Sequence, residues 1–280
     1  MPASKAPPSA PAIWAGSGGH TWVATQDLID QLFRPLESIL VDEVVSSHAR
    51  RILDVGCGTG GTTVAIAHRL AGAGTCTGVD LSEPMIASAR RRSEEAGVSV
   101  DFIVADAQRH PFPAATFDAV VSRFGVMFFD DPVAAFANLR KASAPGATLR
   151  QLVWRSADEN PFMTAAEEAA APLLPELPVR RPNEPGQFGL AEEEHVHRIL
   201  AASGWTEGEL QRLDVPCVMP AAELERYLSH LGPVGRALQE AADEQLLRRV
   251  MAAVRPAFDR YVVGDQVRFV AACWMLCARA

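Results

Sequence analysis

The chain has 280 residues, of which 48% are hydrophobic and 21% are charged, and acidic residues outnumber basic ones 34 to 26. The resulting net charge of −8 argues against a nucleic-acid or anionic-membrane partner, because such partners select a basic surface. The N-terminal residues lack the continuous apolar core of a secretory signal, and no run of about twenty apolar residues could span a bilayer. We therefore expect a cytoplasmic protein whose partner is a small molecule.

Cysteine spacing gives no sign of a disulfide or a metal site. No two cysteines form a Cys-x-x-Cys pair, and most of them lie in apolar, strand-like runs. We predict that all are reduced core residues and that no metal is bound. They are Cys57, Cys76, Cys217, Cys273 and Cys277.

The first half of the chain alternates between strand and helix patterns. Residues 1–25, rich in Pro, Ser and Gly, are expected to form a loosely docked arm. Leucines at three- and four-residue spacing predict a helix over 26–46. Strands are then predicted at 52–55, 75–81, 100–105, 117–124 and 148–154, with helices between them. This alternation predicts right-handed crossovers and a binding core over 26–156.

Beyond Trp154 the pattern changes. Prolines between 172 and 185 exclude one long helix, so 157–190 is expected to be a lid insertion. A core helix and strand are expected at 191–219, a lid of two helices at 220–265, and a final core strand at 266–280. The fold class is therefore α/β, with a doubly wound, mainly parallel, seven-stranded Rossmann-like sheet and helical lid insertions.

The segment "RILDVGCGTGG" at 51–61 fits two glycine patterns at once. Gly56, Gly58 and Gly61 spell the dinucleotide pattern G-x-G-x-x-G. Gly56, Gly58 and Gly60 spell G-x-G-x-G, with Asp54 two positions ahead. A carboxylate at the mouth of the first strand would repel a pyrophosphate but attract an ammonium and a sulfonium.

Two further acids follow the next strands. Asp80 ends the second strand, where a carboxylate can accept both hydroxyls of a ribose under either interpretation of the turn. Asp106 ends the third strand, where a carboxylate can face an adenine amino group. Asp106 therefore favours the second glycine pattern.

Five segments, in this order, carry a family resemblance: "LDVGCGTG", "GVDLSEPM", "VADAQ", "FDAVVSRFGVMFF" and "LRKASAPGATL". Over about residues 50–155 the chain resembles the class I S-adenosylmethionine-dependent methyltransferases. The branch it resembles most is the ubiquinone- and menaquinone-biosynthesis type (methyltransferase type 11). The resemblance implies S-adenosylmethionine as cofactor and S-adenosylhomocysteine as product.

The resemblance also implies roles for individual residues. The glycine turn and Asp54 would hold the methionine part, Asp80 the ribose, Asp106 the adenine edge, and the carbonyl of Ser122 the ammonium. The implied cofactor-binding residues are Trp22, Gln26, Asp54, Gly56, Cys57, Gly58, Gly60, Asp80, Leu81, Met85, Asp106, Ala107, Gln108, Ser122 and Arg123.

Methyl transfer from a sulfonium depends on alignment and exclusion of water more than on a general base. No catalytic residue is therefore assigned, and the candidates are Arg123, His20 and His110. Arg123 would hold a carboxylate of the acceptor or of the cofactor, or pair with an acid such as Asp130. The acceptor is expected to be a small, partly apolar metabolite, with O-methylation favoured.

Two other functions fit parts of the pattern. A nicotinamide-dependent dehydrogenase would explain Gly61, but Asp54 and Asp106 count against it and no Tyr-x-x-x-Lys pair is present. A catalytically silent S-adenosylmethionine-binding module would keep every glycine, and a fold alone does not exclude it.

Overall fold

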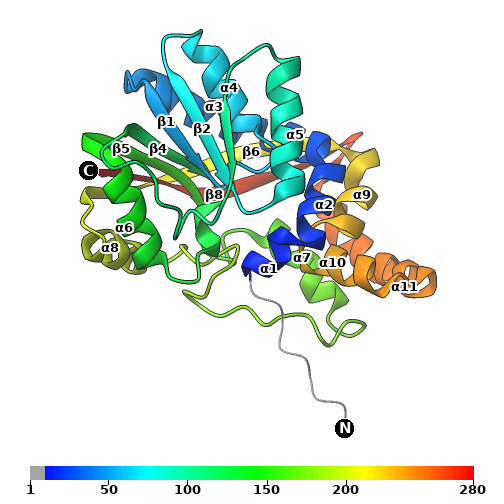
Figure 1. The fold of residues 1–280 in the computed structure, drawn as a ribbon. Helices are drawn as coiled ribbons and strands as arrows, with labels where there is room; N and C mark the ends of the chain where they lie inside the picture. Colours follow the sequence, from blue (N-terminus) through cyan, green and yellow to red (C-terminus); the bar gives the residue numbers. More distant parts are fainter. Residues whose placement is uncertain (1–9) are drawn as a thin grey trace.

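A computed structural model describes residues 10–280 and has an eight-stranded sheet at its centre (Figure 1). The strand order is β3-β2-β1-β4-β5-β8-β6, and β7 pairs only with β8. The first five strands run parallel, whereas β8 is antiparallel to both β5 and β6. Their bounds are β1 (Arg51–Val55), β2 (Thr75–Asp80), β3 (Asp101–Val104), β4 (Phe117–Arg123), β5 (Ser143–Trp154), β6 (Thr206–Pro220), β7 (Val262–Val263) and β8 (Gln266–Arg279).

The doubly wound, mainly parallel sheet is confirmed, but the predicted number of seven strands is one too few. The extra strand, β7, has two residues and forms a tight hairpin with β8. Gly264 at the turn has a φ of +62°, which favours glycine. A two-residue strand is too short to produce a periodic signal in the sequence.

The direction of the crossovers places the helices on both faces of the sheet. α4 (Gly61–Leu70) and α5 (Glu83–Glu95) connect strands that progress from β1 towards β3, whereas α6 (Pro132–Ala142) connects β4 to β5 in the opposite direction. Right-handed crossovers therefore put α4 and α5 on one face and α6 on the other. The order reverses between β1 and β4, which leaves a crevice at their carboxyl ends.

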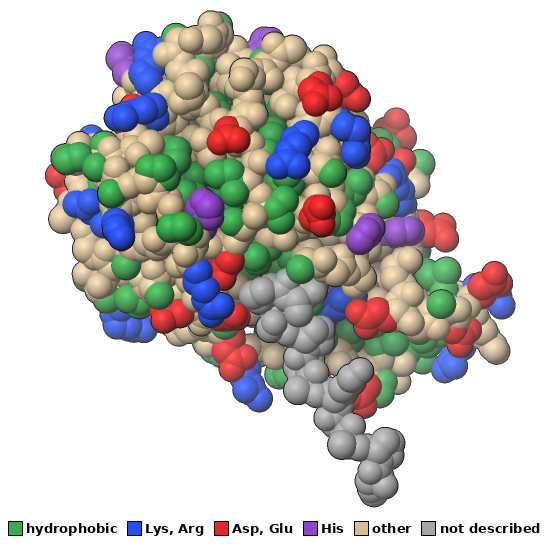
Figure 2. Space-filling view, viewed as in Figure 1, with side chains coloured by type: hydrophobic (Ala, Val, Ile, Leu, Met, Phe, Trp, Pro, Cys, Tyr) green, Lys and Arg blue, Asp and Glu red, His purple; other side chains and the backbone are tan. Residues whose placement is uncertain are grey.

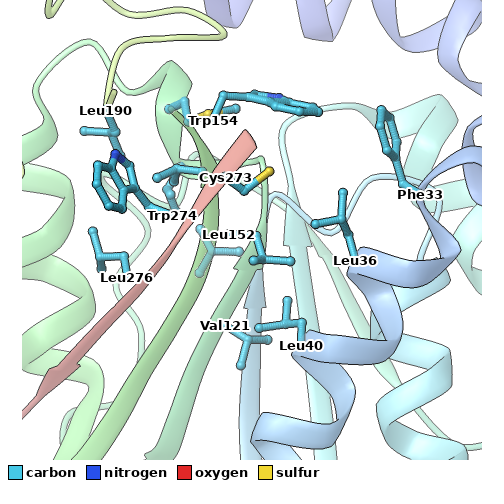
Figure 3. Packing of buried hydrophobic residues seen from close by; sticks show 14 of the residues in the cluster. Phe33, Leu36, Leu40, Val121, Leu152, Trp154, Leu190, Cys273, Trp274 and Leu276 are labelled. Carbon is cyan, nitrogen blue, oxygen red and sulfur yellow. The ribbon is translucent and has the colours of Figure 1, made fainter. Parts of the chain in front are cut away.

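The predicted helix over 26–46 is confirmed as α3 (Gln26–Ser46), and it supplies much of the core. Figure 3 shows Phe33, Leu36 and Leu40 of α3 facing Leu152 and Val121 of the sheet. Leu36 and Leu40 are fully buried. Because these leucines recur every fourth residue, one stripe of the helix meets the sheet along its length.

The arm expected at 1–25 is wrong from residue 10 onwards, and residues 1–9 lie outside the described part. α1 (Ala10–Ala15) and α2 (Ser17–Ala24) form instead, and α2 packs on α5. A Cβ on Gly19 would lie 2.2 Å from the Oγ of Ser82, so the helix backbone approaches the loop after β2 directly. Trp14 and Trp22 meet edge to face at 5.5 Å. These tertiary contacts outweigh the Pro- and Gly-rich composition.

The lid regions hold more helices than predicted. Residues 157–190 contain α7 (Pro161–Ala170), and 220–265 contain three helices rather than two: α9 (Leu224–His230), α10 (Gly232–Ala241) and α11 (Glu244–Val254). Asp243 separates α10 from α11, since its carboxylate accepts hydrogen bonds from the first turn of α11. The remaining elements are α8 (Glu193–Ala202) and the 3-10 helices Val126–Phe128, Ala221–Glu223 and Arg255–Tyr261.

In Figure 1 the lid helices α7, α10 and α11 lie with α1 and α2 at the lower end of the sheet. Figure 2 shows acidic and basic side chains interspersed over the described residues of the same face. Within residues 10–280 no helix is both long and apolar enough to cross a membrane. All five cysteines are buried and free, as predicted.

Candidate active site

A cavity of about 840 Å³ lies where β1, β2 and β4 end. The turns after these strands form its floor, while α1, α2, α7, α9, α10 and residues 178–189 form its walls and roof. Of the predicted cofactor-binding residues, Trp22, Asp54, Gly56, Cys57, Gly58, Asp80, Leu81, Met85, Asp106, Ala107 and Arg123 line this cavity. The cavity thus coincides with the topological switch point of the sheet.

The glycines of the turn after β1 serve different purposes. Gly56, Gly58 and Gly60 all have positive φ, at +65°, +55° and +80°. A Cβ on Gly56 would lie 2.6 Å from the Cα of Gly125, so two backbones meet there. A Cβ on Gly58 would meet only Met85 and Trp22, each at 3.7 Å, so it would occupy open space at the cavity floor. Gly58 is the position where the missing side chain leaves room for a ligand.

Gly60 and Gly61 face away from the cavity. A Cβ on Gly60 would lie 2.8 Å from the Cβ of Ala89, so Gly60 lets α4 approach α5. A Cβ on Gly61 would lie 2.8 Å from an Nη atom of Arg92. Gly60 does not line the cavity, and its predicted contact with a cofactor stays a prediction. Packing against Arg92 is enough to explain a glycine at position 61. Gly61 therefore does not distinguish the dinucleotide pattern from the G-x-G-x-G pattern.

Asp54 is 1% exposed and lies at the end of β1. The hydroxyl of Thr63 donates to its Oδ2 at 2.6 Å. The pKa of Asp54 is raised to about 7, mainly by burial. The Thr63 hydrogen bond and the charge of Arg123 lower this pKa, whereas the charges of Asp80 and Glu37 raise it. The site thus holds a carboxylate that a bound cation would stabilise in its ionised form.

Asp80 forms hydrogen bonds to the turns after β1 and β2. Its two carboxylate oxygens accept hydrogen bonds from the backbone N–H groups of Gly58 and Ser82, both at 2.9 Å. Burial raises the pKa of Asp80, and these backbone hydrogen bonds oppose the rise. The carboxylate therefore fixes the turn after β1 relative to the turn after β2.

Asp106 lies at the cavity wall after β3, where its Oδ1 accepts from the N–H of Gln108 at 2.9 Å. Three other predicted cofactor residues do not line the cavity, and the side chain of each makes a hydrogen bond elsewhere. Gln108 accepts from the N–H of Asp131, Gln26 accepts from the hydroxyl of Ser88, and Ser122 donates to the carbonyl of Val55. The role predicted for Ser122 belongs to its carbonyl, so it stays a prediction.

Arg123 lines the cavity, but its guanidinium is already engaged on the α3 side. Its Nε donates to the hydroxyl of Thr62 at 3.0 Å, and an Nη lies 4.0 Å from Asp30. Asp30 also pairs with Arg92 at 2.5 Å. The acid beside Arg123 is thus Asp30 rather than the expected Asp130. Of the N–H donors of Arg123, only the Nε–H makes a hydrogen bond within residues 10–280, so its Nη groups keep donors for a bound ligand.

The candidate bases His20 and His110 do not line the cavity. His20 is exposed on α2, with its Nδ1 near the carbonyl of Gly16, and His110 packs edge-on against Phe112. His230 of α9 lines the lid side instead, with its Nδ1 2.9 Å from the hydroxyl of Ser229. It was missed because nothing in its local sequence marks it as facing a cavity.

The cavity lining also contains an aromatic cluster beside β4, β5 and α3, and an ion pair in the lid. Phe124 and Trp154 stack with ring centroids 4.4 Å apart, and Phe33 meets both edge-on. Arg180 forms an ion pair with Glu167 of α7 within this lining. No local sequence pattern marks either residue, because they lie thirteen positions apart and only the lid's folding brings them together.

Residues 52–146 match the protein family described as "Methyltransferase domain". The chain is 40% identical over 109 residues to a demethylmenaquinone methyltransferase of Thermus thermophilus, covering 39% of this chain and 49% of that protein. It is 34% identical over 108 residues to aklanonic acid methyltransferase DauC of a Streptomyces species, covering 38% of this chain and 49% of that protein. The matches thus span about half the length of these curated relatives.

A solved structure of a putative methyltransferase from Bacillus halodurans has a TM-score of 0.54 and 16% identity, covering 85% of this chain and 97% of that chain. Similarity at this level of identity is evidence of a shared fold. Residues 52–146 of the chain therefore match a methyltransferase domain, and the fold is shared with the solved structure of a putative methyltransferase.

Proposed function

We propose that the protein transfers a methyl group from S-adenosylmethionine to an oxygen of a small, partly apolar acceptor. The observation that carries this proposal is one cavity lined by both carboxylates and aromatic rings. Asp54, Asp80 and Asp106 lie at or just after the carboxyl end of three adjacent strands, and aromatic side chains line other parts of the same cavity. These carboxylates suit a ligand with an ammonium, a sulfonium and ribose hydroxyls, and they oppose a pyrophosphate.

The residues around the turn after β1 fit this cofactor. The open space at Gly58 leaves room for its methionine part, and Asp54 would hold the ammonium. Asp80 would accept hydrogen bonds from the ribose hydroxyls, while Asp106 and the backbone of Ala107 would bind the adenine edge. Leu81 and Met85 line the same wall and would pack against the adenine.

The cofactor supplies an electrophilic methyl carbon on a positively charged sulfur. The protein's task is to align the acceptor oxygen with that carbon and to exclude water. Trp14, Trp22 and Phe128 form an edge-to-face aromatic set at the cavity wall that serves this exclusion. The names of the two curated relatives, a demethylmenaquinone and an aklanonic acid methyltransferase, support small-molecule acceptors.

Binding of S-adenosylhomocysteine is expected to weaken as the pH falls through 7. The ligand's ammonium favours ionised Asp54, whose pKa is about 7 in the folded protein, so below that pH binding must release a proton. We expect roughly tenfold weaker affinity at pH 6 than at pH 8, measured by calorimetry in buffers of different ionisation enthalpy.

The matched variant for this prediction is Asp54→Asn, which keeps the size of the side chain and removes its charge. It should bind more weakly at pH 8 and lose the dependence between pH 6 and 8. If Asp54→Asn retains the full pH dependence, another group causes it.

The proposed activity is tested by incubating the protein with S-adenosylmethionine and a set of phenols, carboxylic acids and amines. We expect S-adenosylhomocysteine to form in an acceptor-dependent way, with the mass of one acceptor increased by one methyl group. Methylation at nitrogen or carbon would refute the O-methylation part alone. Tight cofactor binding without product from any acceptor would favour the silent module.

A further inference from the structure

His230 lines the cavity from α9, a lid helix that lies beside α2 (Figure 1). Arg226, one turn earlier on α9, fixes this position, because its guanidinium donates to the carbonyl of Ala24 at 2.6 Å. Ala24 is the last residue of α2, the helix that also carries Trp22. The indole nitrogen of Trp22 lies 3.7 Å from where a Cβ on Gly58 would be. α9 is therefore held next to the helix that borders the turn after β1.

The face of α9 that carries His230 points inward. Tyr227 and His230 of α9, and Leu231 directly after it, all line the cavity. Residues three and four apart on a helix lie on the same face, so these side chains point the same way. Among residues 10–280, no other histidine lines this cavity.

The hydrogen bonds around His230 decide which ring nitrogen carries its hydrogen. Nδ1 lies 3.1 Å from the carbonyl oxygen of Arg226 and 2.9 Å from the Oγ of Ser229. A carbonyl oxygen can only accept, and the Ser229 hydroxyl directs its one hydrogen to the carbonyl of Glu225, 2.7 Å away. Nδ1 is therefore the donor, and Nε2 of the neutral imidazole keeps a free lone pair.

That lone pair is available to a ligand. Because Nδ1 lies against the backbone of α9, Nε2 occupies the edge of the ring that is farther from the helix. Within the described part of the chain Nε2 of His230 has no hydrogen-bond partner, yet it is accessible to water, whereas Nε2 of His195 is buried. Nε2 is thus the atom of His230 that can meet a molecule in the cavity.

Other groups of the lid are less able to take up a proton. The carboxylates of the lid that line the cavity are paired with arginines: Glu167 with Arg180, Glu184 with Arg181, and Glu240 with Arg236. A neighbouring positive charge favours the ionised form of a carboxylate and so makes it a weaker base. The Tyr227 hydroxyl donates to the Met163 sulfur, and burial raises the pKa of Tyr227, which keeps it protonated.

We propose that Nε2 of His230 accepts a hydrogen bond from the acceptor's hydroxyl group and takes up its proton during methyl transfer. This inference rests on the proposed function, because it names a base for O-methylation in the same cavity. An electron pair of the acceptor oxygen forms the bond to the methyl carbon, the carbon–sulfur bond breaks to leave a neutral thioether, and the proton moves to Nε2. The positive charge lost by sulfur then resides on His230.

The proposal also names the acceptor class. A weakly acidic hydroxyl, such as that of a phenol, requires a base for this reaction, whereas a carboxylate is already ionised. A phenol also presents an aromatic ring to the aromatic side chains of the cavity, among them Phe33, Phe124 and Trp154.

The first readout needs no ligand and no turnover. In the nitrogen-15 spectrum of the unmodified protein we expect the hydrogen of neutral His230 on Nδ1, and the spectrum of His230→Gln assigns the signal. A hydrogen on Nε2 would overturn the inference, because that nitrogen could then not accept a proton.

The second readout is calorimetry on the full chain with saturating S-adenosylhomocysteine. The probe is 2-naphthol, and 2-fluoronaphthalene is its analogue without a donor. We expect 2-naphthol to bind about fivefold or more tightly than the analogue, the effect of one hydrogen bond. His230→Leu should remove this preference, and His230→Gln, which keeps an acceptor atom, should retain it. His197→Gln is the control, since His197 is exposed on α8 and outside the cavity lining.

The third readout separates proton uptake from binding. With S-adenosylmethionine and 2-naphthol as substrates, His230→Gln should lower kcat by about a hundredfold or more and leave KM nearly unchanged. A residue with a purely structural role would change KM and thermal stability as well. Melting curves identify a variant that fails to fold, and the spectrum of the unmodified protein then carries the test.

Two further outcomes would overturn the inference: no preference for 2-naphthol over 2-fluoronaphthalene in the unmodified protein, or a kcat in His230→Gln equal to that of the unmodified protein. Titration with S-adenosylhomocysteine alone tests the proposed function separately. If that ligand does not bind, the proposed function fails, while the position of the hydrogen on His230 and the preference for 2-naphthol still test the role of Nε2.

Discussion

Asp80→Ala is expected to lower the affinity for S-adenosylhomocysteine at least a hundredfold. The change removes the carboxylate proposed to bind the ribose, and it also releases the N–H groups of Gly58 and Ser82, which position the two turns. Each buried N–H left without a partner costs about 1–3 kcal/mol, so the free energy of unfolding should also fall. Calorimetry gives the affinity, and urea denaturation gives the stability.

Asp118→Ala is the matched control for Asp80→Ala. Asp118 lies at the opposite end of the sheet, where its carboxylate also accepts two backbone hydrogen bonds, from Arg50 at 2.9 Å and Arg51 at 2.7 Å. This variant should lose stability but keep its affinity for S-adenosylhomocysteine. If both variants lose affinity equally, the effect of Asp80 is one of stability and not of binding.

Gly56→Ala is expected to destabilise the protein by about 3 kcal/mol or more. The added Cβ would lie 2.6 Å from the Cα and 3.3 Å from the carbonyl carbon of Gly125, so two backbone segments must separate. The φ of +65° adds strain for any residue with a side chain. Thermal and urea denaturation measure the loss.

Gly72→Ala measures the cost of a positive φ without a steric clash, and it is the matched control for Gly56→Ala. Gly72 also has a positive φ, at +80°, but a Cβ there would meet nothing within 4 Å. This variant should lose only about 1 kcal/mol, the cost of the backbone conformation. Equal losses in the two variants would mean that the contact between Gly56 and Gly125 is unimportant for stability.

The parts of the fold that were predicted correctly have a local signal of sufficient length. The leucine stripe predicted α3 with both its ends, and the turns after β1, β2 and β3 marked the ends of those strands. The start of β5 was placed five residues late, since Pro145-Gly146 resembles a turn. The strand in fact begins at Ser143 and passes through Gly146, which has a φ of +78°.

The parts that were missed depend on contacts between distant segments. α1 and α2 are stabilised by the packing of Gly19 on Ser82 and of Trp14 on Phe128, which their own composition does not reveal. At the cofactor end of the site, strand ends and glycines define positions locally, so most of the predicted residues line the cavity. At the lid end, Glu167 and Arg180 come from the 157–190 insertion and His230 from the 220–265 insertion. Their proximity depends on how the lid folds.

The cofactor assignment is tested most directly by calorimetric titration of the protein with S-adenosylhomocysteine and, in parallel, with NAD. Carboxylates at the ends of three adjacent strands predict saturable binding of S-adenosylhomocysteine at one site per chain and no heat of binding for NAD. Saturable binding of NAD alone would contradict the assignment of the turn after β1 to S-adenosylmethionine, together with the methyl-transfer function built on it.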